Sequence, residues 1–85
     1  MKKLLFMPDA WEDFEYWLDH DPEIADRIRQ LLKECCRDPF RGIGKPEPLK
    51  HQLTGYWSRR ISREDRMVYR VDKEHLVILQ LRCHY

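Results

Sequence analysis

Four residues in the second half of the chain have side chains suited to acid–base chemistry on a phosphate ester. Glu47 stands between two prolines, which restrict the backbone enough to hold a carboxylate in a fixed direction, so it is a candidate general base. Arg66 carries a planar guanidinium that can donate two parallel hydrogen bonds to a phosphate. Histidine is the side-chain type that exchanges a proton near neutral pH, so His84 is a candidate proton donor, while Tyr85 adds an aromatic ring and a phenol.

Together these groups match the needs of RNA cleavage, because the 2′-hydroxyl of RNA is its own nucleophile. A base takes the proton of that hydroxyl, a cation stabilises the charge on the phosphorus oxygens, and an acid protonates the leaving 5′ oxygen. DNA lacks the 2′-hydroxyl and is spared by this chemistry. Lys50 and Arg60 are candidates for holding flanking phosphates. We expect no cofactor and no metal, and no C-x-x-C or H-x-x-x-H spacing is present to bind zinc.

Three of these candidates could also have a structural role instead of a catalytic one. Glu47 could balance the neighbouring lysines, Arg66 could pair with the acidic residues just before it, and His84 could be an exposed tail side chain. Cys83 and His84 are not expected to form a nucleophile–base pair, because adjacent residues of a strand point to opposite faces. Two further histidines are interpreted as surface or structural groups: His51 and His75.

The first half of the sequence predicts one strand and two helices. Residues 4–7 are apolar and favour a short buried strand. Asp9 is the predicted N-cap of the first helix, with Glu12 completing a capping box, and this helix is expected to end near residues 19–20. Asp21 is the predicted cap of the second helix, followed by a proline that fits the first helical position. The second helix carries an apolar stripe at helical spacing: Ile24, Ile28, Leu31, Leu32 and Cys35.

The second half predicts a loop and three strands. Residues 38–49 contain three prolines and two glycines, and a loop of this length is more often functional than idle. Strands are expected over 56–61, 66–71 and 76–81. We therefore predict an α+β fold, with an N-terminal strand and a two-helix hairpin packed on a twisted, mostly antiparallel sheet. The uncovered face of that sheet is expected to display basic side chains together: Arg60, Arg66, Arg82 and His84.

Composition limits the class of protein. An 85-residue chain is expected to form a single domain over residues 1–85. Residues 1–40 have a charge balance of −4 and residues 41–70 one of +5, which points to a polyanion on one face. Three cysteines, two of them adjacent, do not make a disulfide framework. The opening apolar stretch is too short for an export signal, and no segment approaches the roughly 20 apolar residues of a membrane span, so the expected compartment is the cytoplasm.

The whole chain resembles the YoeB toxins, in register and at a matching length. The resemblance is carried by residues 38–51, by residues 53–61, by the strand that begins Asp65-Arg66-Met67, and by the final pair His84-Tyr85. YoeB proteins belong to the RelE-like superfamily, which has a microbial-ribonuclease-like α+β fold. The resemblance implies a metal-independent endoribonuclease that enters the ribosomal A site and cleaves the codon there. Such cleavage leaves a 2′,3′-cyclic phosphate and a 5′-hydroxyl, and it inhibits translation.

The resemblance also implies roles and partners. By position, the general base, the transition-state arginine, the general acid and the terminal tyrosine of the family fall on Glu47, Arg66, His84 and Tyr85, and the substrate-binding cations fall on Lys50 and Arg60. Implied partners are a YefM-like antitoxin, the ribosome with its mRNA, and operator DNA bound through the antitoxin complex for co-repression. Homodimers are implied as well. The adjacent cysteines, Cys35 and Cys36, depart from the family pattern and leave redox sensitivity open.

Two other functions are compatible with the same sequence. A non-catalytic module would act only as a co-repressor or as a block on the ribosome, but an inactivated copy should have lost one of three side chains that are all present: Glu47, Arg66 and His84. A ribonuclease that needs no ribosome would use the same groups. Cleavage of naked RNA by the purified protein distinguishes that second alternative.

Overall fold

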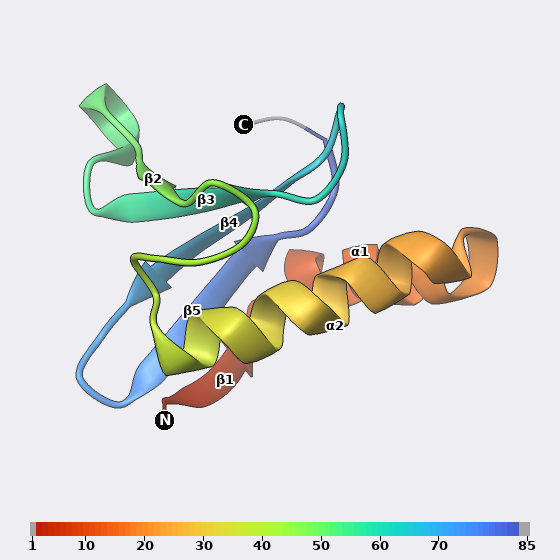
Figure 1. Ribbon diagram of the computed structural model, residues 1–85, viewed down its shortest axis with the longest axis horizontal. Helices are drawn as coiled ribbons and strands as arrows, with labels where there is room; N and C mark the ends of the chain where they lie inside the picture. Colours follow the sequence, from red (N-terminus) through yellow and green to blue (C-terminus); the bar gives the residue numbers. More distant parts are fainter. Residues whose placement is uncertain (1, 84–85) are drawn as a thin grey trace.

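The structure is a computed structural model that describes residues 2–83 and shows two helices packed beside one five-stranded sheet (Figure 1). The predicted α+β fold is confirmed. His84 and Tyr85, which carry two of the predicted roles, lie outside the described residues. Along the chain the elements are β1 (Lys3–Phe6), α1 (Pro8–His20), α2 (Pro22–Arg37), β2 (Glu47–Pro48), a 3-10 turn η1 (His51–Leu53), β3 (Tyr56–Arg60), β4 (Arg66–Val71) and β5 (His75–Gln80).

The sheet is mostly antiparallel, as predicted. Its strand order is β1-β5-β4-β3-β2. Only β1 runs parallel to its neighbour, β5, and the three other pairs are antiparallel. Since β2 to β5 pair in chain order, each strand of this meander lies beside the one that follows it. The strand that begins with Arg66, β4, therefore lies between β3 and β5, and the strand that begins with Glu47 forms one edge.

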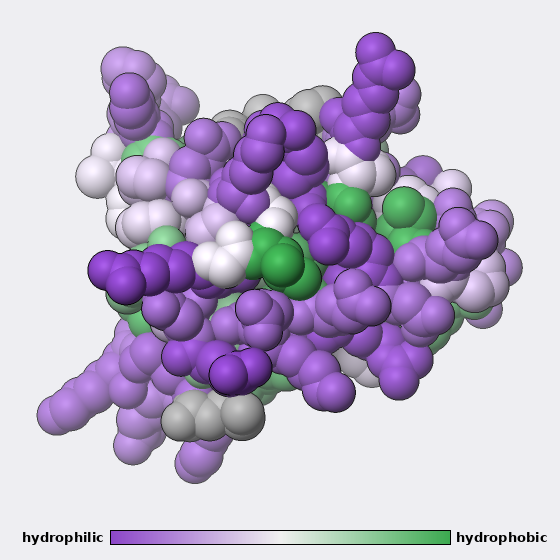
Figure 2. Space-filling view, viewed as in Figure 1, coloured by the Kyte–Doolittle hydropathy of each residue, from purple (hydrophilic) through white to green (hydrophobic). Residues whose placement is uncertain are grey.

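One hydrophobic core lies between the helix hairpin and the sheet. The stripe predicted on α2 faces this core, and the sheet supplies the opposing side chains. Fully burying an aliphatic side chain of this size contributes about 1.5–3 kcal/mol, so these contacts hold the two layers together. The side of α2 seen in Figure 2 is hydrophilic, as expected for an amphipathic helix. The fully buried members of the core include Ile28, Leu31, Cys35, Met67, Tyr69 and Ile78.

Of the two predicted helix caps, one is confirmed and one is wrong. The side chain of Asp21 accepts a hydrogen bond from the backbone N–H of Ile24 at 3.3 Å, as predicted for α2. The first helix begins at Pro8 with Met7 as its N-cap, and no side-chain cap hydrogen bond forms. Because the fixed φ of proline suits the first helical position, the helix starts before Asp9 and encloses it in the first turn. Within residues 2–83, no helix combines the length and apolar character needed to cross a membrane.

The first strand is an edge strand, so the prediction of a buried strand over residues 4–7 is wrong. It covers Lys3–Phe6 and pairs only with β5. Leu4 is 43% exposed and Leu5 is 39% exposed, because an edge strand has a neighbour on one side only.

The segment after α2 is irregular as predicted, with one difference. Glu47 and Pro48 form β2, which pairs with β3 in the register Glu47↔Ser58 and Pro48↔Trp57. Proline is tolerated here because an edge strand leaves one side of its backbone without a ladder partner. Glu47 is thus fixed to the sheet and does not sit on a free loop.

Candidate active site

Glu47 and Arg66, which were predicted from separate parts of the sequence, are in contact in the structure. Nη1 of Arg66 donates to Oε1 of Glu47 at 3.0 Å and to Oγ of Ser58 at 3.2 Å. The β2–β3 register places Glu47 opposite Ser58, and the β3–β4 register places Arg66 opposite Arg60. Since alternate residues of a strand share a face, all four positions lie on one side of the sheet. Strand pairing, and not closeness in sequence, brings the carboxylate to the guanidinium.

The pair is accessible from its outer side and fixed from its inner side. The Glu47 side chain is 52% exposed and the Arg66 side chain is 18% exposed. Ser58 is fully buried, so its hydroxyl holds the guanidinium from beneath. Glu47 is half exposed, so water weakens the attraction between the two charges, and the contact is better suited to orienting two groups than to holding the fold together.

The two predicted phosphate-binding residues lie at different places. Arg60 is exposed and stands directly across from Arg66 in the β3–β4 ladder. Like charges directly opposite each other on one face destabilise a sheet, so these two arginines favour an anion between them. Lys50 is exposed, three residues beyond Glu47, at the start of η1.

The last described residue is anchored beside Arg66. The backbone N–H of Cys83 donates to Oδ1 of Asp65 at 2.7 Å, and the backbone N–H of Arg66 donates to the carbonyl of Cys83 at 3.2 Å. Cys83 has a φ of +66°, a left-handed conformation that side chains other than glycine adopt rarely. The residue that His84 follows in the sequence is therefore tied to the strand that carries Arg66.

Arg82 does not join the basic side chains on the uncovered face, so that expectation is wrong. Its guanidinium carbon lies 3.5 Å from the ring centroid of Tyr16 on α1. A cation over an aromatic face is attracted by the ring quadrupole, and this contact draws Arg82 toward the helix layer.

Two residues near this cluster were not predicted, Ser58 and Arg59. Arg59 is fully buried and donates to backbone carbonyls of the segment that precedes β2. The sequence did contain a signal, because strand alternation places Arg59 on the same side as Trp57 and Ile61. An arginine on an apolar strand face must find hydrogen-bond acceptors, and that requirement identifies it as a structural or positioning residue.

Burial keeps two groups behind the site neutral. It raises the pKa of the Cys35 thiol to about 11, although the nearby Arg59 guanidinium acts in the opposite direction. Burial also raises the pKa of the Tyr69 phenol, an effect that its hydrogen bond with Arg59 partly offsets. A thiol in this state is a poor nucleophile at neutral pH, so Cys35 is a packing residue.

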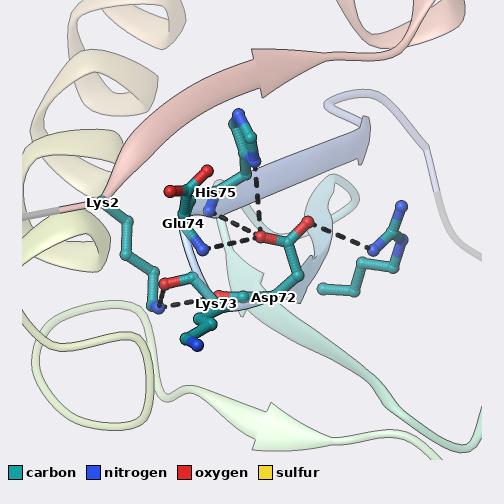
Figure 3. A network of polar contacts seen from close by, with 6 residues as sticks. Lys2, Asp72, Lys73, Glu74 and His75 are labelled. Atoms are coloured by element: carbon teal, nitrogen blue, oxygen red, sulfur yellow. Dashed lines mark hydrogen bonds and ion pairs between the residues drawn. The ribbon is translucent and has the colours of Figure 1, made fainter.

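A second polar network lies at the other end of β4 (Figure 3). The carboxylate of Asp72 accepts hydrogen bonds from the backbone N–H groups of His75 at 2.6 Å and Glu74 at 3.0 Å, and these bonds lower its pKa. Nζ of Lys2 donates to the carbonyls of Asp72 at 2.7 Å and Lys73 at 3.0 Å. Every one of these contacts joins the β4–β5 turn to itself or to the N-terminal segment, so the network has a structural role.

The candidate site lies on an open sheet face. A surface hollow of about 970 Å³ lies along α2, and neither Glu47 nor Arg66 lines it. Among residues 2–83, no group of three or more His, Cys, Asp or Glu side chains is placed to hold a metal ion. A carboxylate, a guanidinium and a second arginine on an open face suit a long anionic polymer better than an enclosed small molecule.

Solved toxin structures are similar to this chain over nearly their whole length. The YoeB dimer from Staphylococcus aureus matches with a TM-score of 0.92 and 45% identity over 99% of this chain and 98% of that one. A chain of the heterotetrameric YoeB–YefM toxin–antitoxin complex from the same organism matches with a TM-score of 0.90 and 44% identity over 100% and 99%. The toxin–antitoxin complex RelBE2 of Mycobacterium tuberculosis, at 24% identity, a TM-score of 0.76 and 98% coverage of each chain, shares the fold. The class is that of toxins from type II toxin–antitoxin systems.

Sequence comparison gives the family within that class. The family model described as the YoeB-like toxin of bacterial type II toxin–antitoxin systems matches residues 6–85. Toxin RelK of Mycobacterium tuberculosis is 54% identical over 85 residues, which is 100% of each chain. The chain belongs to the YoeB-like toxin family, which confirms the resemblance drawn from the residues.

Proposed function

We propose that this YoeB-like toxin is a metal-independent, ribosome-dependent endoribonuclease that cleaves mRNA at the codon in the ribosomal A site. The observation that carries the proposal is the 3.0 Å contact between Glu47 and Arg66 on an open, basic sheet face. Internal cleavage of RNA needs a base, a phosphate-binding cation and an acid, and this contact brings candidates for the first two together.

The reaction is a displacement at phosphorus by the neighbouring 2′-hydroxyl. Glu47 takes the hydroxyl proton as the oxygen bonds to phosphorus, and Arg66 stabilises the negative charge that develops on the non-bridging oxygens. The bond to the 5′ oxygen breaks, and His84 gives that oxygen a proton. The products are a 2′,3′-cyclic phosphate and a 5′-hydroxyl. Tyr85 offers an aromatic face on which a base can stack.

The starting geometry supports these roles. The guanidinium of Arg66 is planar and carries several N–H donors, a shape that suits a phosphate, and the buried hydroxyl of Ser58 helps to keep it in place. Glu47 is half exposed, so an arriving ribose can reach its second oxygen. Arg60 supplies a second cation on the same face, and Lys50 a third beyond Glu47, for the flanking phosphates.

The anchor of Cys83 supports the role given to His84. Two hydrogen bonds hold Cys83 to Asp65 and Arg66, and the acid that we propose is the next residue in the sequence. A general acid has to be held near the leaving oxygen of a phosphate bound at Arg66. One of the two hydrogen bonds that hold Cys83 comes from the backbone of Arg66 itself.

The partners that we propose follow from the family. Staphylococcus aureus YoeB occurs in a complex with YefM and as a dimer. We infer that this chain binds a YefM-like antitoxin, that the complex represses its own operon by binding operator DNA, and that the free toxin can dimerise. Ribosomes are its place of action, so it works in the cytoplasm. Co-purification with the antitoxin encoded beside it, followed by operator gel shifts with and without the toxin, tests these partners.

Mapping of RNA 5′ ends in cells that express the protein tests the activity. We expect cuts within translated codons, in frame, and none with Arg66→Ala, which should remain folded. Toxin that has been treated with EDTA and found free of bound metal by elemental analysis should cut ribosome-bound message as fast as untreated toxin, because the mechanism uses no metal held by the protein. Equal cutting of naked RNA would show that no ribosome is needed. Undiminished cutting by Arg66→Ala would remove Arg66 from the mechanism.

A further inference from the structure

Arg59 is a charged residue in the interior with an unusual set of partners. Its side chain is fully buried. Within residues 2–83 it forms no ion pair with a carboxylate, and its hydrogen bonds go to neutral oxygens. Burying a guanidinium without a counter-charge is costly unless its donors are satisfied, so these bonds define its role.

Those bonds converge on residues 38–44, which make up most of the segment between α2 and β2. Nη2 of Arg59 donates to the carbonyls of Asp38 at 2.6 Å and Arg41 at 2.7 Å, and Nη1 donates to the carbonyl of Ile43 at 2.9 Å. Nε donates to the hydroxyl of Tyr69 at 3.3 Å, and that hydroxyl donates to a fourth carbonyl of the segment at 2.6 Å, that of Pro39. We call Arg59 and Tyr69 together the latch.

The backbone at the end of these residues, at Gly44, is closely packed. Gly44 has a φ of +82°, and a Cβ there would lie 2.8 Å from Cδ2 of Leu31. Its carbonyl accepts a hydrogen bond from the backbone N–H of Arg60 at 2.6 Å. Glu47 follows three residues later, as the first residue of β2. Hydrogen bonds therefore hold the chain at five positions between residues 38 and 44, shortly before it reaches the carboxylate.

One strand, β3, holds both sides of this arrangement. Arg59 points to the helix side and fastens residues 38–44, while its neighbours Ser58 and Arg60 point to the open face. Ser58 is the ladder partner of Glu47 and also binds Arg66. On the helix side of β3, Arg59 holds the segment that leads to β2. On the open face, Ser58 pairs with Glu47 in the ladder and so sets its position.

We propose that Arg59 is a positioning residue for Glu47, and that the latch sets the direction of this carboxylate toward Arg66. The role of Glu47 as the base rests on the function proposed above, while the latch itself does not. A planar group with five N–H donors can bind several carbonyls at once, whereas a lysine ammonium is a compact charge on a flexible stem. A lysine at position 59 would therefore keep the positive charge but could not bind the same set of carbonyls at once.

Three variants and a control test the proposal: Arg59→Lys, Tyr69→Phe, Glu47→Gln, and Arg29→Lys as the control. Arg29 is exposed on α2, and its ion pair among residues 2–83 is with Asp26, one turn away. Hydrogen–deuterium exchange of residues 38–46 reports on the latch without any reference to activity. Cleavage of ribosome-bound mRNA, measured as a function of ribosome concentration, separates kcat from KM.

We expect Tyr69→Phe to fold, to exchange faster over residues 38–46 than over α1 or α2, and to lose about 10-fold in kcat with an unchanged KM. Arg59→Lys should lose about 100-fold, because a displacement near 1 Å at a reacting group can cost that much. The Arg29→Lys control should match the parent protein. If Arg59→Lys does not fold, Tyr69→Phe decides the question.

Two results would overturn the proposal. Unchanged exchange over residues 38–46 in Tyr69→Phe would show that the latch does not hold the segment. Faster exchange with an unchanged kcat would show that the latch holds the segment but does not position Glu47. Full activity of Glu47→Gln would instead defeat the proposed mechanism, and the exchange measurement would still decide whether the latch exists.

Discussion

At the scale of single residues, the guanidinium of Arg66 is fixed by what it touches on each side. A buried hydroxyl, that of Ser58, holds it from within the sheet, and a half-exposed carboxylate, that of Glu47, meets it at the surface. These two contacts are made by Nη1, and a planar group with several N–H donors can keep such contacts while it binds a phosphate. The chemistry proposed here depends on that shape as much as on the charge.

Replacing Arg66 with lysine tests shape against charge. Arg66→Lys keeps one positive charge at the start of β4 but cannot contact Ser58, Glu47 and a phosphate in one plane. We expect cleavage of ribosome-bound mRNA to fall about 100-fold, comparable to the loss of one oxyanion donor in other enzymes. Urea unfolding should change little, because lysine keeps the positive charge beside the half-exposed Glu47 and water weakens that ion pair. A rate within twofold of the parent protein would show that charge alone is sufficient.

At the scale of elements, local sequence signals predicted a helix correctly where they agreed with one another. The stripe on α2 and its Asp21 cap were predicted correctly, because spacing and cap chemistry agree. Asp9 was predicted as a cap for α1, but Pro8 just before it fits the first helical position better. The two-residue strand β2 could not be predicted, since its pairing depends on where β3 lies and not on its own composition.

The two caps give a matched pair of stability variants. Asp21→Ala removes the acceptor for the N–H of Ile24 and should lower the free energy of unfolding by about 1 kcal/mol. Asp9→Ala removes no cap hydrogen bond and should lose only its charge interaction with the helix N-terminus, about 0.3 kcal/mol at an exposed position. Urea unfolding at neutral pH measures both. Equal losses would mean that Asp9 caps α1 in solution.

The β4–β5 turn predicts a pH dependence that is separate from the site. The N–H groups of His75 and Glu74 stabilise the charged form of Asp72 and lower its pKa. A carboxyl whose pKa is lower in the folded than in the unfolded state adds stability above its unfolded pKa, and this is lost as the pH falls through the folded value. The parent protein should therefore be more stable than Asp72→Asn at pH 7, and the two urea midpoints should converge in acid. A constant gap at every pH would contradict this cause.

At the scale of the whole molecule, the site depends on the order of strands in the sheet. Glu47, Arg60 and Arg66 share a face because β2, β3 and β4 pair in chain order. Strand alternation predicted that Arg60 and Arg66 share it, but not that Glu47 joins them, because β2 was not predicted. The position of Arg82 could not be predicted, because its partner Tyr16 lies on α1, far away in the sequence. Arg59 shows the same limit, since the carbonyls it binds become neighbours only when the segment before β2 folds back.

The end of the chain divides into a part that holds the fold and a part that we assign to chemistry. Leu81 is fully buried, its N–H donates to Oδ2 of Asp13 at 3.0 Å, and its carbonyl accepts from Nε1 of Trp17 at 2.8 Å. Cys83 is held by Asp65 through its N–H. These anchors join the end of the sheet to α1 and to the β3–β4 turn without using the last two residues.

Two truncations should therefore behave differently. A protein ending at Cys83 keeps these anchors, so its free energy of unfolding should stay within about 0.5 kcal/mol of the parent value while cleavage of ribosome-bound mRNA is lost with His84. A protein ending at Gln80 loses the buried Leu81 and its bonds, and should be destabilised by about 3 kcal/mol or more. Urea unfolding followed by circular dichroism measures the stability of both truncated proteins, and single-turnover kinetics measure their cleavage of mRNA. If the protein ending at Cys83 still cuts mRNA at the parent rate, another group protonates the leaving oxygen, and the anchor beside Arg66 serves only the fold.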